Sequence, residues 1–291
     1  DIAIYADTHI RSGTGAYNVV DYVHNSGTID GAVMLAAGND VVLNSGTMYG
    51  RTLLEDGNDR YDGSAGYHFG SVEGGNGNDI LIGGSGPEYL YGDGGNDTLV
   101  GGGGDDLIDG GLGADSLDGG AGFDIVSFAE SMLGVTVHLA TGVASDGQSR
   151  DRIGGFEQVI GSHQDDNIFG SDAAEALVGA GGDDLVSGGG GNDVLRGERG
   201  NDILTGGSGS DAFLFSAGDG ADVVTDFAAG DELEIHGYLS AQSIAQVGAD
   251  VVVTLSATDA VTLRNTSVAS VQSGLSFLGQ ELASVAVTPD Q

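Results

Sequence analysis

Large apolar residues recur every nine residues in two stretches of the chain, and the segments between them are polar and rich in glycine. In the first stretch, residues 74–127, these apolar residues are Leu81, Leu90, Leu99, Ile108, Leu117 and Val126. In the second stretch, residues 161–214, they are Ile168, Leu177, Val186, Leu195, Leu204 and Phe213. Each is the middle residue of a three-residue segment, which predicts a short strand whose middle side chain points into a core. The six residues before each strand predict a turn in which glycine permits left-handed backbone torsions.

An acidic residue occupies the sixth position of every unit, whose fullest form is G-G-x-G-x-D-x-U-x, with U large and apolar. In the first block these residues are Asp79, Glu88, Asp97, Asp106, Asp115 and Asp124. In the second block they are Asp166, Glu175, Asp184, Asp193, Asp202 and Asp211. Two units are expected to close one coil, and stacked coils pair as parallel strands about 4.8 Å apart. Turns two units apart therefore lie over each other on one flank and bring their carboxylates together.

The charge of the chain indicates what these carboxylates bind. The 291 residues include 44 acidic and eight basic residues, all of the latter arginine, for a formal net charge of −36. Such self-repulsion opposes a compact fold unless cations are bound. Carboxylates and backbone carbonyls supply the 6–8 oxygens that Ca²⁺ prefers, whereas Mg²⁺ needs a tighter octahedron and keeps more water. The sequence predicts on the order of eight to ten Ca²⁺ ions between stacked turns. The candidate metal ligands are Asp40, Asp59, Asp79, Glu88, Asp97, Asp106, Asp115, Asp124, Asp166, Asp184, Asp193, Asp202 and Asp211.

Composition also excludes several partners. Nucleic acid and anionic membrane surfaces would be repelled by this charge. The chain has no cysteine, which excludes disulfides, thiolate zinc sites and cysteine nucleophiles. No uninterrupted apolar run approaches the roughly 18 residues of a membrane span.

The two blocks resemble the calcium-binding β-roll of the RTX (repeats-in-toxin) family, and the motif covers residues 74–127 and 161–214 directly. The resemblance implies an all-β chain, a right-handed parallel β-roll or β-helix solenoid that ends in a small C-terminal β cap. It also implies secretion by a type I system that reads an uncleaved C-terminal signal. It implies no single activity, because many kinds of exported protein carry such modules.

The first 73 residues contain a longer period. Asp21, Asp40, Asp59 and Asp79 are spaced 19, 19 and 20 residues apart. This predicts enlarged coils that keep an acidic turn on one flank only, with the roll starting near residue 15. One column of acidic turns is then expected to run through Asp40, Asp59, Asp79, Asp97 and Asp115.

Two further segments complete the expected organisation. Residues 128–160 separate the blocks, and irregular coils that continue the roll are favoured there over a flexible linker. Residues 215–291 are expected to form the cap, in which "DVVVTLSATDAVTLRN" predicts a β-hairpin with "SATD" as its turn. By family resemblance, the last stretch of the chain would carry the secretion signal.

Glu88 and Glu175 depart from the repeat in the same way, because each is the second unit of its block. If the enlarged coils carry acidic turns on one flank only, Glu88 is the first acidic turn of the opposite column. The longer side chain is then tolerable because the first turn does not bridge two ions. We expect a metal on the Glu88 side that is shared only with the Asp106 turn.

Known catalytic patterns are missing from the sequence. It contains no H-E-x-x-H, no G-x-S-x-G and no lysine for a P-loop, and its six histidines are scattered. Adjacent acidic pairs such as Asp105 and Asp106 fall in the repeat register, which favours calcium ligation or a solvated flank over glycosidase chemistry. The chain is therefore not expected to be an enzyme.

Three roles remain open. The first is a secreted structural protein of the cell surface or matrix, such as a surface layer, filament or adhesin, with self-association. The second is a calcium-dependent module of an exported enzyme whose catalytic domain lies upstream of residue 1. The third is a polysaccharide-binding module, because eight of nine tyrosines precede residue 92 and Tyr89 and Tyr91 lie at outward strand positions. Ordinary β-propensity also explains these tyrosines.

Overall fold

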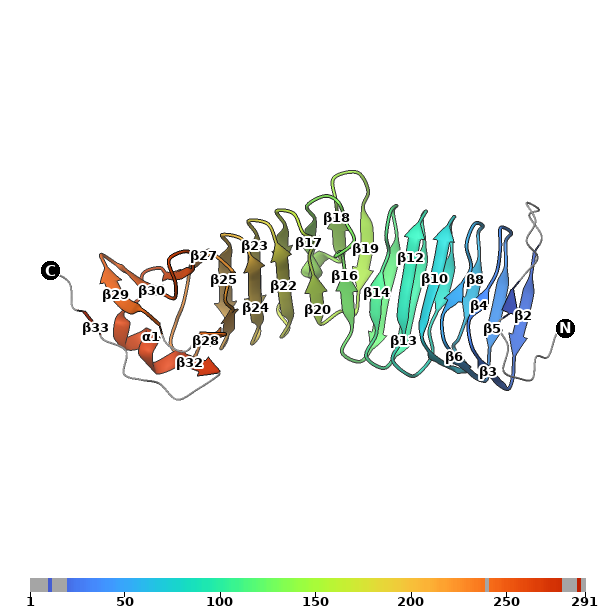
Figure 1. Cartoon of the computed structure of the whole chain (residues 1–291), viewed down its shortest axis with the longest axis horizontal. Helices are drawn as coiled ribbons and strands as arrows, with labels where there is room; N and C mark the ends of the chain where they lie inside the picture. Colours follow the sequence, from blue (N-terminus) through green and yellow to red (C-terminus); the bar gives the residue numbers. More distant parts are fainter. Residues whose placement is uncertain (1–9, 12–19, 239–240, 279–286, 289–291) are drawn as a thin grey trace. The chain divides into compact units, whose positions relative to one another are not determined.

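The computed structural model describes residues 10–11, 20–238, 241–278 and 287–288. The chain divides into two compact units. Unit 1 comprises residues 1–130 and 142–158, and unit 2 comprises residues 131–141 and 159–291. Both units are built almost entirely from short parallel strands stacked coil upon coil, which confirms the expected all-β solenoid (Figure 1).

Unit 1 is a roll with two walls of parallel strands. One wall runs in the order β1 (Ile10–Arg11), β4 (Val33–Met34), β7 (Thr52–Leu53), β10 (Ser71–Asn76), β12 (Tyr89–Gly94), β14 (Leu107–Asp109) and β16 (Ile125–Ser127). The other runs in the order β2 (Tyr22–Asn25), β5 (Val41–Asn44), β8 (Arg60–Asp62), β11 (Ile80–Ile82), β13 (Thr98–Gly103), β15 (Ser116–Ala121) and β19 (Asp151–Gly154). The first coils add a third parallel sheet of β3 (Thr28–Asp30), β6 (Thr47–Tyr49) and β9 (Tyr67–Phe69).

The register of these strands confirms the enlarged coils. Tyr22 pairs with Val41, Val41 with Arg60 and Arg60 with Ile80, which are steps of 19, 19 and 20 residues, and Ile80 then pairs with Thr98, a step of 18. The expected start near residue 15 lies outside the described residues. The earlier strand β1 already pairs in parallel with β4.

Unit 2 repeats the two-walled design and adds the cap. One wall contains β20 (Gln158–Ile160), β22 (Ala176–Gly181), β24 (Val194–Arg199), β26 (Ala212–Phe215), β28 (Glu232–His236) and β32 (Leu275–Leu278). The other contains β17 (Thr136–His138), β21 (Asn167–Phe169), β23 (Leu185–Gly190), β25 (Ile203–Ser208), β27 (Ala221–Val224) and β31 (Ala260–Leu263). Neighbouring labelled strands such as β22 and β24 can be followed in Figure 1.

The segment between the repeat blocks takes part in the rolls, but not in sequence order. Leu117 in β15 pairs with Ile153 in β19, while Val137 in β17 pairs with Ile168 in β21. The chain passes into unit 2 at Ser131, returns to unit 1 at Gly142 and leaves it after Gln158. A 3₁₀ turn, Leu139–Thr141, and the strand β18 (Val143–Ser145), antiparallel to β19, make the return. Coils here are therefore expected as predicted, whereas their crossed order was not.

The cap contains the predicted hairpin. Strands β30 (Asp250–Thr254) and β31 are antiparallel, and β29 (Ser243–Val247) extends the hairpin on the other side of β30. Strand β33 (Val287–Thr288) pairs in parallel with β29. A helix that the repeat pattern did not predict, α1 (Val268–Gly274), begins at Ser267, whose side chain accepts the Ser270 N–H. No helix in the described ranges has the length and apolar character needed to cross a bilayer. The expected secretion signal falls largely on residues 279–286 and 289–291, outside the described part.

The core consists of the middle strand residues, as predicted. All twelve are at most 2% exposed. Glycine at the turns allows the coils to approach closely; for example, a Cβ on Gly95, where φ is +144°, would lie 1.6 Å from the Gly77 carbonyl oxygen.

Adjacent residues of β11 provide a test of this core. Leu81 is fully buried and Ile80 is 39% exposed. We expect Leu81→Ala to lower the free energy of unfolding in saturating calcium by about 3 kcal/mol, because it leaves a cavity between coils. Ile80→Ala should cost less than about 1 kcal/mol. Urea titrations followed by circular dichroism measure both, and equal losses would contradict the assigned facing of the strand.

Candidate metal centre

The acidic residues of the repeats form hydrogen-bonded columns along the rolls. The backbone N–H of Asp79 donates to Oδ1 of Asp97 at 2.7 Å, and the Asp97 N–H donates to Oδ1 of Asp115 at 2.8 Å. The column containing these residues comprises Asp21, Asp40, Asp59, Asp79, Asp97, Asp115 and Asp151. On the opposite flank of unit 1 the column comprises Glu88, Asp106, Asp124 and Glu157.

Unit 2 has two columns of the same kind. One comprises Asp166, Asp184, Asp202 and Asp222. The other comprises Glu175, Asp193, Asp211 and Asp231. All thirteen candidate ligands therefore lie in columns, and turns 18 to 20 residues apart stack on one flank as predicted. Because no ligand is present, their binding of metal stays a prediction.

The second carboxylate oxygen distinguishes the interior of each column. It is buried and has no hydrogen-bond donor in ten Asp residues and in Glu88: Asp40, Asp59, Asp79, Asp97, Asp106, Asp115, Asp124, Asp184, Asp193, Asp202, Asp211 and Glu88 Oε2 complete the group apart from Asp166. A buried carboxylate oxygen without a donor is strongly unfavourable unless a cation or a proton compensates it.

Backbone carbonyls face the same positions. A Cβ placed on Gly74 would lie 2.4 Å from Oδ2 of Asp79 and 2.9 Å from the Gly92 carbonyl oxygen of the next coil. The corresponding point on Gly161 lies 2.4 Å from Oδ2 of Asp166 and 2.5 Å from the Gly179 carbonyl oxygen. Each turn therefore presents a carboxylate oxygen and a carbonyl oxygen to one small space that only glycine leaves open.

This donor set fits a hard cation such as Ca²⁺, which takes carboxylate and carbonyl oxygens in a flexible geometry. Among the described residues no three Asp, Glu, His or Cys side chains cluster as a metal site. Side chains alone therefore do not make a site here, and backbone oxygens from two stacked turns are needed. When bound, Ca²⁺ would supply the positive charge that the buried oxygens lack.

Burial raises the pKa of the column carboxyls. Desolvation brings the pKa of Asp97 and of Asp115 to about 7 and that of Asp184 to about 8. The N–H donated to Oδ1 acts in the opposite direction, while neighbouring carboxylates of the column add to the increase. Without cations, these groups would exchange their charge for a proton near neutral pH.

The residue before each column carboxylate forms a second set of hydrogen bonds, which the sequence analysis missed. The N–H of Asn96 donates to Oδ1 of Asn78 at 2.7 Å, and the N–H of Asn201 donates to Oδ1 of Asp183 at 2.8 Å. The donor here belongs to the later coil, whereas in the columns it belongs to the earlier coil. The recurring "ND" and "DD" pairs were the available signal.

Four column residues were also missed. Asp222 and Asp231 follow Asp202 and Asp211 by 20 residues, the step already seen among the enlarged coils. Asp151 follows Asp115 by 36 residues, or two coils of 18. Spacing therefore contained a signal for these three, but none for Glu157, which lies 33 residues after Asp124.

The pair Asp183 and Asp184 separates the column from general surface charge. Asp184→Asn keeps an acceptor for the Asp166 N–H but removes charge from the buried oxygen, so we expect the calcium concentration at the folding midpoint to rise roughly tenfold. Asp183→Asn removes the same charge from an exposed residue and should change the midpoint less than about twofold. Calcium titrations by circular dichroism measure both; equal shifts would contradict a special role for the columns.

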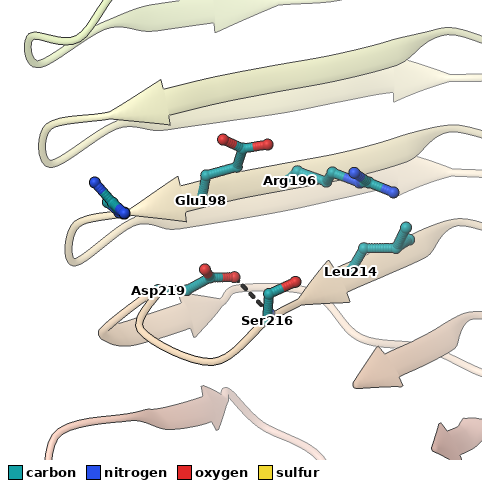
Figure 2. Close-up of a pocket in the computed structure, with 6 residues that line it drawn as sticks. Arg196, Glu198, Leu214, Ser216 and Asp219 are labelled. Atoms are coloured by element: carbon teal, nitrogen blue, oxygen red, sulfur yellow. Dashed lines mark hydrogen bonds between the residues drawn. The ribbon is translucent and has the colours of Figure 1, made fainter. Parts of the chain in front are cut away.

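Away from the columns, unit 2 has an open pocket of about 240 Å³ lined by Arg196, Glu198, Arg199, Leu214, Ser216 and Asp219. Figure 2 shows Arg196 beside Leu214, with Glu198 on the same strand as Arg196 and a hydrogen bond between Ser216 and Asp219. Neither arginine forms an ion pair with any residue of the described part.

Comparisons with known proteins agree with the repeat assignment. The family described as RTX calcium-binding nonapeptide repeat matches residues 71–87, 91–126, 154–186 and 178–213. Comparison with curated proteins gives no match. Among solved structures, the crystal structure of extracellular lipase LipA from Serratia marcescens is similar at 22% sequence identity and a TM-score of 0.33, over 71% of this chain and 39% of the lipase chain. The chain thus spans well under half the length of that protein.

Proposed function

Because the chain carries RTX calcium-binding nonapeptide repeats, we propose that it is a secreted protein that folds on binding Ca²⁺ outside the cell and then serves a structural role at the cell surface or in the matrix. The observation that supports calcium-dependent folding best is the series of buried carboxylate oxygens without donors. The proposal assigns the chain no catalytic step.

The charge of the chain turns calcium binding into a folding switch. With 44 acidic and eight basic residues, the metal-free chain is repelled by its own charge, and much of its apolar surface lies in single residues per coil. Metal binding to a site that exists only in the folded chain contributes directly to folding free energy. A chain that is unfolded at low cytosolic calcium suits export, and the higher calcium outside would fold it.

An exposed aromatic cluster in unit 1 supports a surface role. Tyr49, Tyr67 and Phe69 are 45%, 53% and 55% exposed, and the rings of Tyr49 and Phe69 stack with centroids 5.2 Å apart. All three lie on the neighbouring strands β6 and β9. Contiguous exposed aromatic surface is typical of contact sites, and we propose that this cluster mediates assembly with other copies of the chain.

Electron microscopy and light scattering in calcium test the structural role. Wild-type protein should form ordered assemblies, and the Tyr49→Ser, Phe69→Ser double variant should remain monomeric. Leu112→Ser is the control, because Leu112 is 72% exposed but lies outside the cluster. Wild-type protein that folds in calcium but stays monomeric would contradict the assembly role and leave calcium-dependent folding intact. Calcium-dependent folding alone would equally suit a module of an exported enzyme.

The pocket of Figure 2 favours binding of an acidic saccharide as a second candidate function. Two unpaired arginines are unusual in so acidic a chain, and guanidinium groups pair well with carboxylates. Glu198 and Asp219 would accept sugar hydroxyls. Isothermal titration with a uronic acid oligosaccharide should show at least tenfold weaker binding for Arg196→Ala, Arg199→Ala than for the equally charged control Arg150→Ala, Arg264→Ala. Equal binding by the two variants would exclude this pocket.

A further inference from the structure

The first carboxylates of the columns in unit 2 are satisfied by serine. The Ser162 N–H donates to Oδ2 of Asp166 at 2.6 Å and its hydroxyl donates to Oδ1 at 2.8 Å. The Ser171 N–H donates to Oε2 of Glu175 at 3.2 Å, and the Ser171 hydroxyl donates to Oε1. Both serines occupy the second position of the same turn. Asp166 and Glu175 therefore need no cation on the side facing away from the next turn.

Glu88 begins its column without such a serine. The second position of its turn is Gly84, which has no hydroxyl to donate, and Glu88 is only 2% exposed, with Oε2 lacking any donor. Glu88 and Glu175 occupy the same position of the repeat but have different surroundings.

Three oxygens fill the space where the serine side chain would lie. A Cβ built on Gly84 would lie 2.7 Å from the Gly66 carbonyl oxygen, 3.0 Å from the Gly63 carbonyl oxygen and 3.3 Å from Oε1 of Glu88. Ca²⁺ binds oxygen at 2.3–2.6 Å. Small shifts would therefore bring all three oxygens to a cation placed at this point.

The preceding coils explain why the space lies here. On this flank Asn25 donates through Nδ2 to Oδ1 of Asn44 at 2.8 Å, so an amide ladder replaces the acidic column. In register, the position of Asn44 corresponds to Gly63 in the next coil, because Leu43 pairs with Asp62. Gly63 has no amide to continue the ladder, and the buried Tyr61 hydroxyl lies beside it, 2.8 Å from where a Cβ would be.

We propose that an additional cation binds at this junction between the amide ladder and the carboxylate column, held by the Glu88 carboxylate and the carbonyl oxygens of Gly63 and Gly66. Ca²⁺ is the cation that this set of oxygens favours. The inference rests on the calcium-dependent folding proposed above. It differs from the sequence-based expectation of an ion shared only with the Asp106 turn.

The longer side chain of Glu88 has a reason in this arrangement. Its carboxylate must reach the carbonyls of the preceding coil while its N–H donates to Oδ1 of Asp106 at 2.8 Å. Only one carboxylate serves the site, and affinity for Ca²⁺ falls with the number of charged ligands. This ion should therefore be among the weakest bound.

Gly84→Ala tests the proposal, because its methyl group would occupy the cation position. Native mass spectrometry at saturating calcium should count one ion fewer in Gly84→Ala than in wild type, with the same circular dichroism spectrum. Ser171→Ala, at the matching position of the second block, should leave the number of ions unchanged. Equal ion counts in wild type and a folded Gly84→Ala would overturn the site.

Crystals of the wild type grown with calcium give a second test that does not depend on the variant folding. An anomalous difference peak is expected between Glu88, Gly63 and Gly66, and none on the corresponding side of Glu175. Peaks at the repeat turns without one at Glu88 would refute this inference alone. A folded protein without any bound calcium would instead refute the proposed function.

Discussion

Removal of calcium at pH 7.5 is expected to abolish most of the β-structure of this chain. The buried column oxygens have no donors, and their mutual repulsion adds to a formal net charge of −36. Far-UV circular dichroism in EGTA should show a disordered spectrum, and calcium added in excess should restore the β signal cooperatively. A full β signal in EGTA would contradict calcium-dependent folding.

Other cations provide the control for this experiment. Magnesium at the same concentration should restore little of the signal, because it demands a small octahedron and gives up water reluctantly. Sodium chloride at matched ionic strength screens exposed charges but not buried ones. Recovery in salt alone would show that general charge repulsion, rather than the columns, keeps the chain unfolded.

The second large effect is the rescue of the metal-free chain by acid. Burial raises the pKa of Asp59, Asp97 and Asp222 to about 7 and that of Asp184 to about 8, from an ordinary value of 3.8. A carboxyl whose pKa is raised on folding contributes stability that is fully present below its unfolded pKa and is lost as pH rises through its folded pKa. The metal-free β signal should therefore be present near pH 4 and lost by about pH 8. A metal-free chain that stays unfolded at every pH would contradict this.

Calcium binding should show the opposite dependence on pH. The ion needs ionised carboxylates, so binding near pH 6.5 displaces protons from column groups such as Asp97 and Asp115. Isothermal titrations in two buffers with different ionisation enthalpies should give different heats. Identical heats would mean that no protons are released.

The periodic part of the fold was predictable because one residue type carries each role. Residues such as Leu99 and Asp97 recur at fixed spacing, and spacing alone places them in the core and in a column. The crossed order of β17 and β19 was not predictable, because nothing in the sequence fixes which coil a strand joins. The serine partner of Glu175 and its absence at Glu88 required the positions of hydroxyl and carbonyl groups in space.

The N-terminal flank gives a similar lesson. The repeated "NSGT" at Asn25 and Asn44 was visible in the sequence, but its chemistry appears only once the coils are in register and one amide donates to the next. The expectation that these coils lack acidic turns on this flank was correct. What replaces the carboxylates there could not be inferred from spacing.

The paired hydrogen bonds at adjacent turn residues fasten each coil in both directions. Asp59 donates to the following coil at Asp79, while Asn78 of that coil donates back to Asn58, and the same two bonds join coils at steps of 18, 19 and 20 residues. The joint between coils is thus set by two residues and is indifferent to how much chain lies between one joint and the next. Evolution or a protein designer can therefore lengthen a coil, or insert a new surface loop into it, without shifting the alignment of the remaining stack.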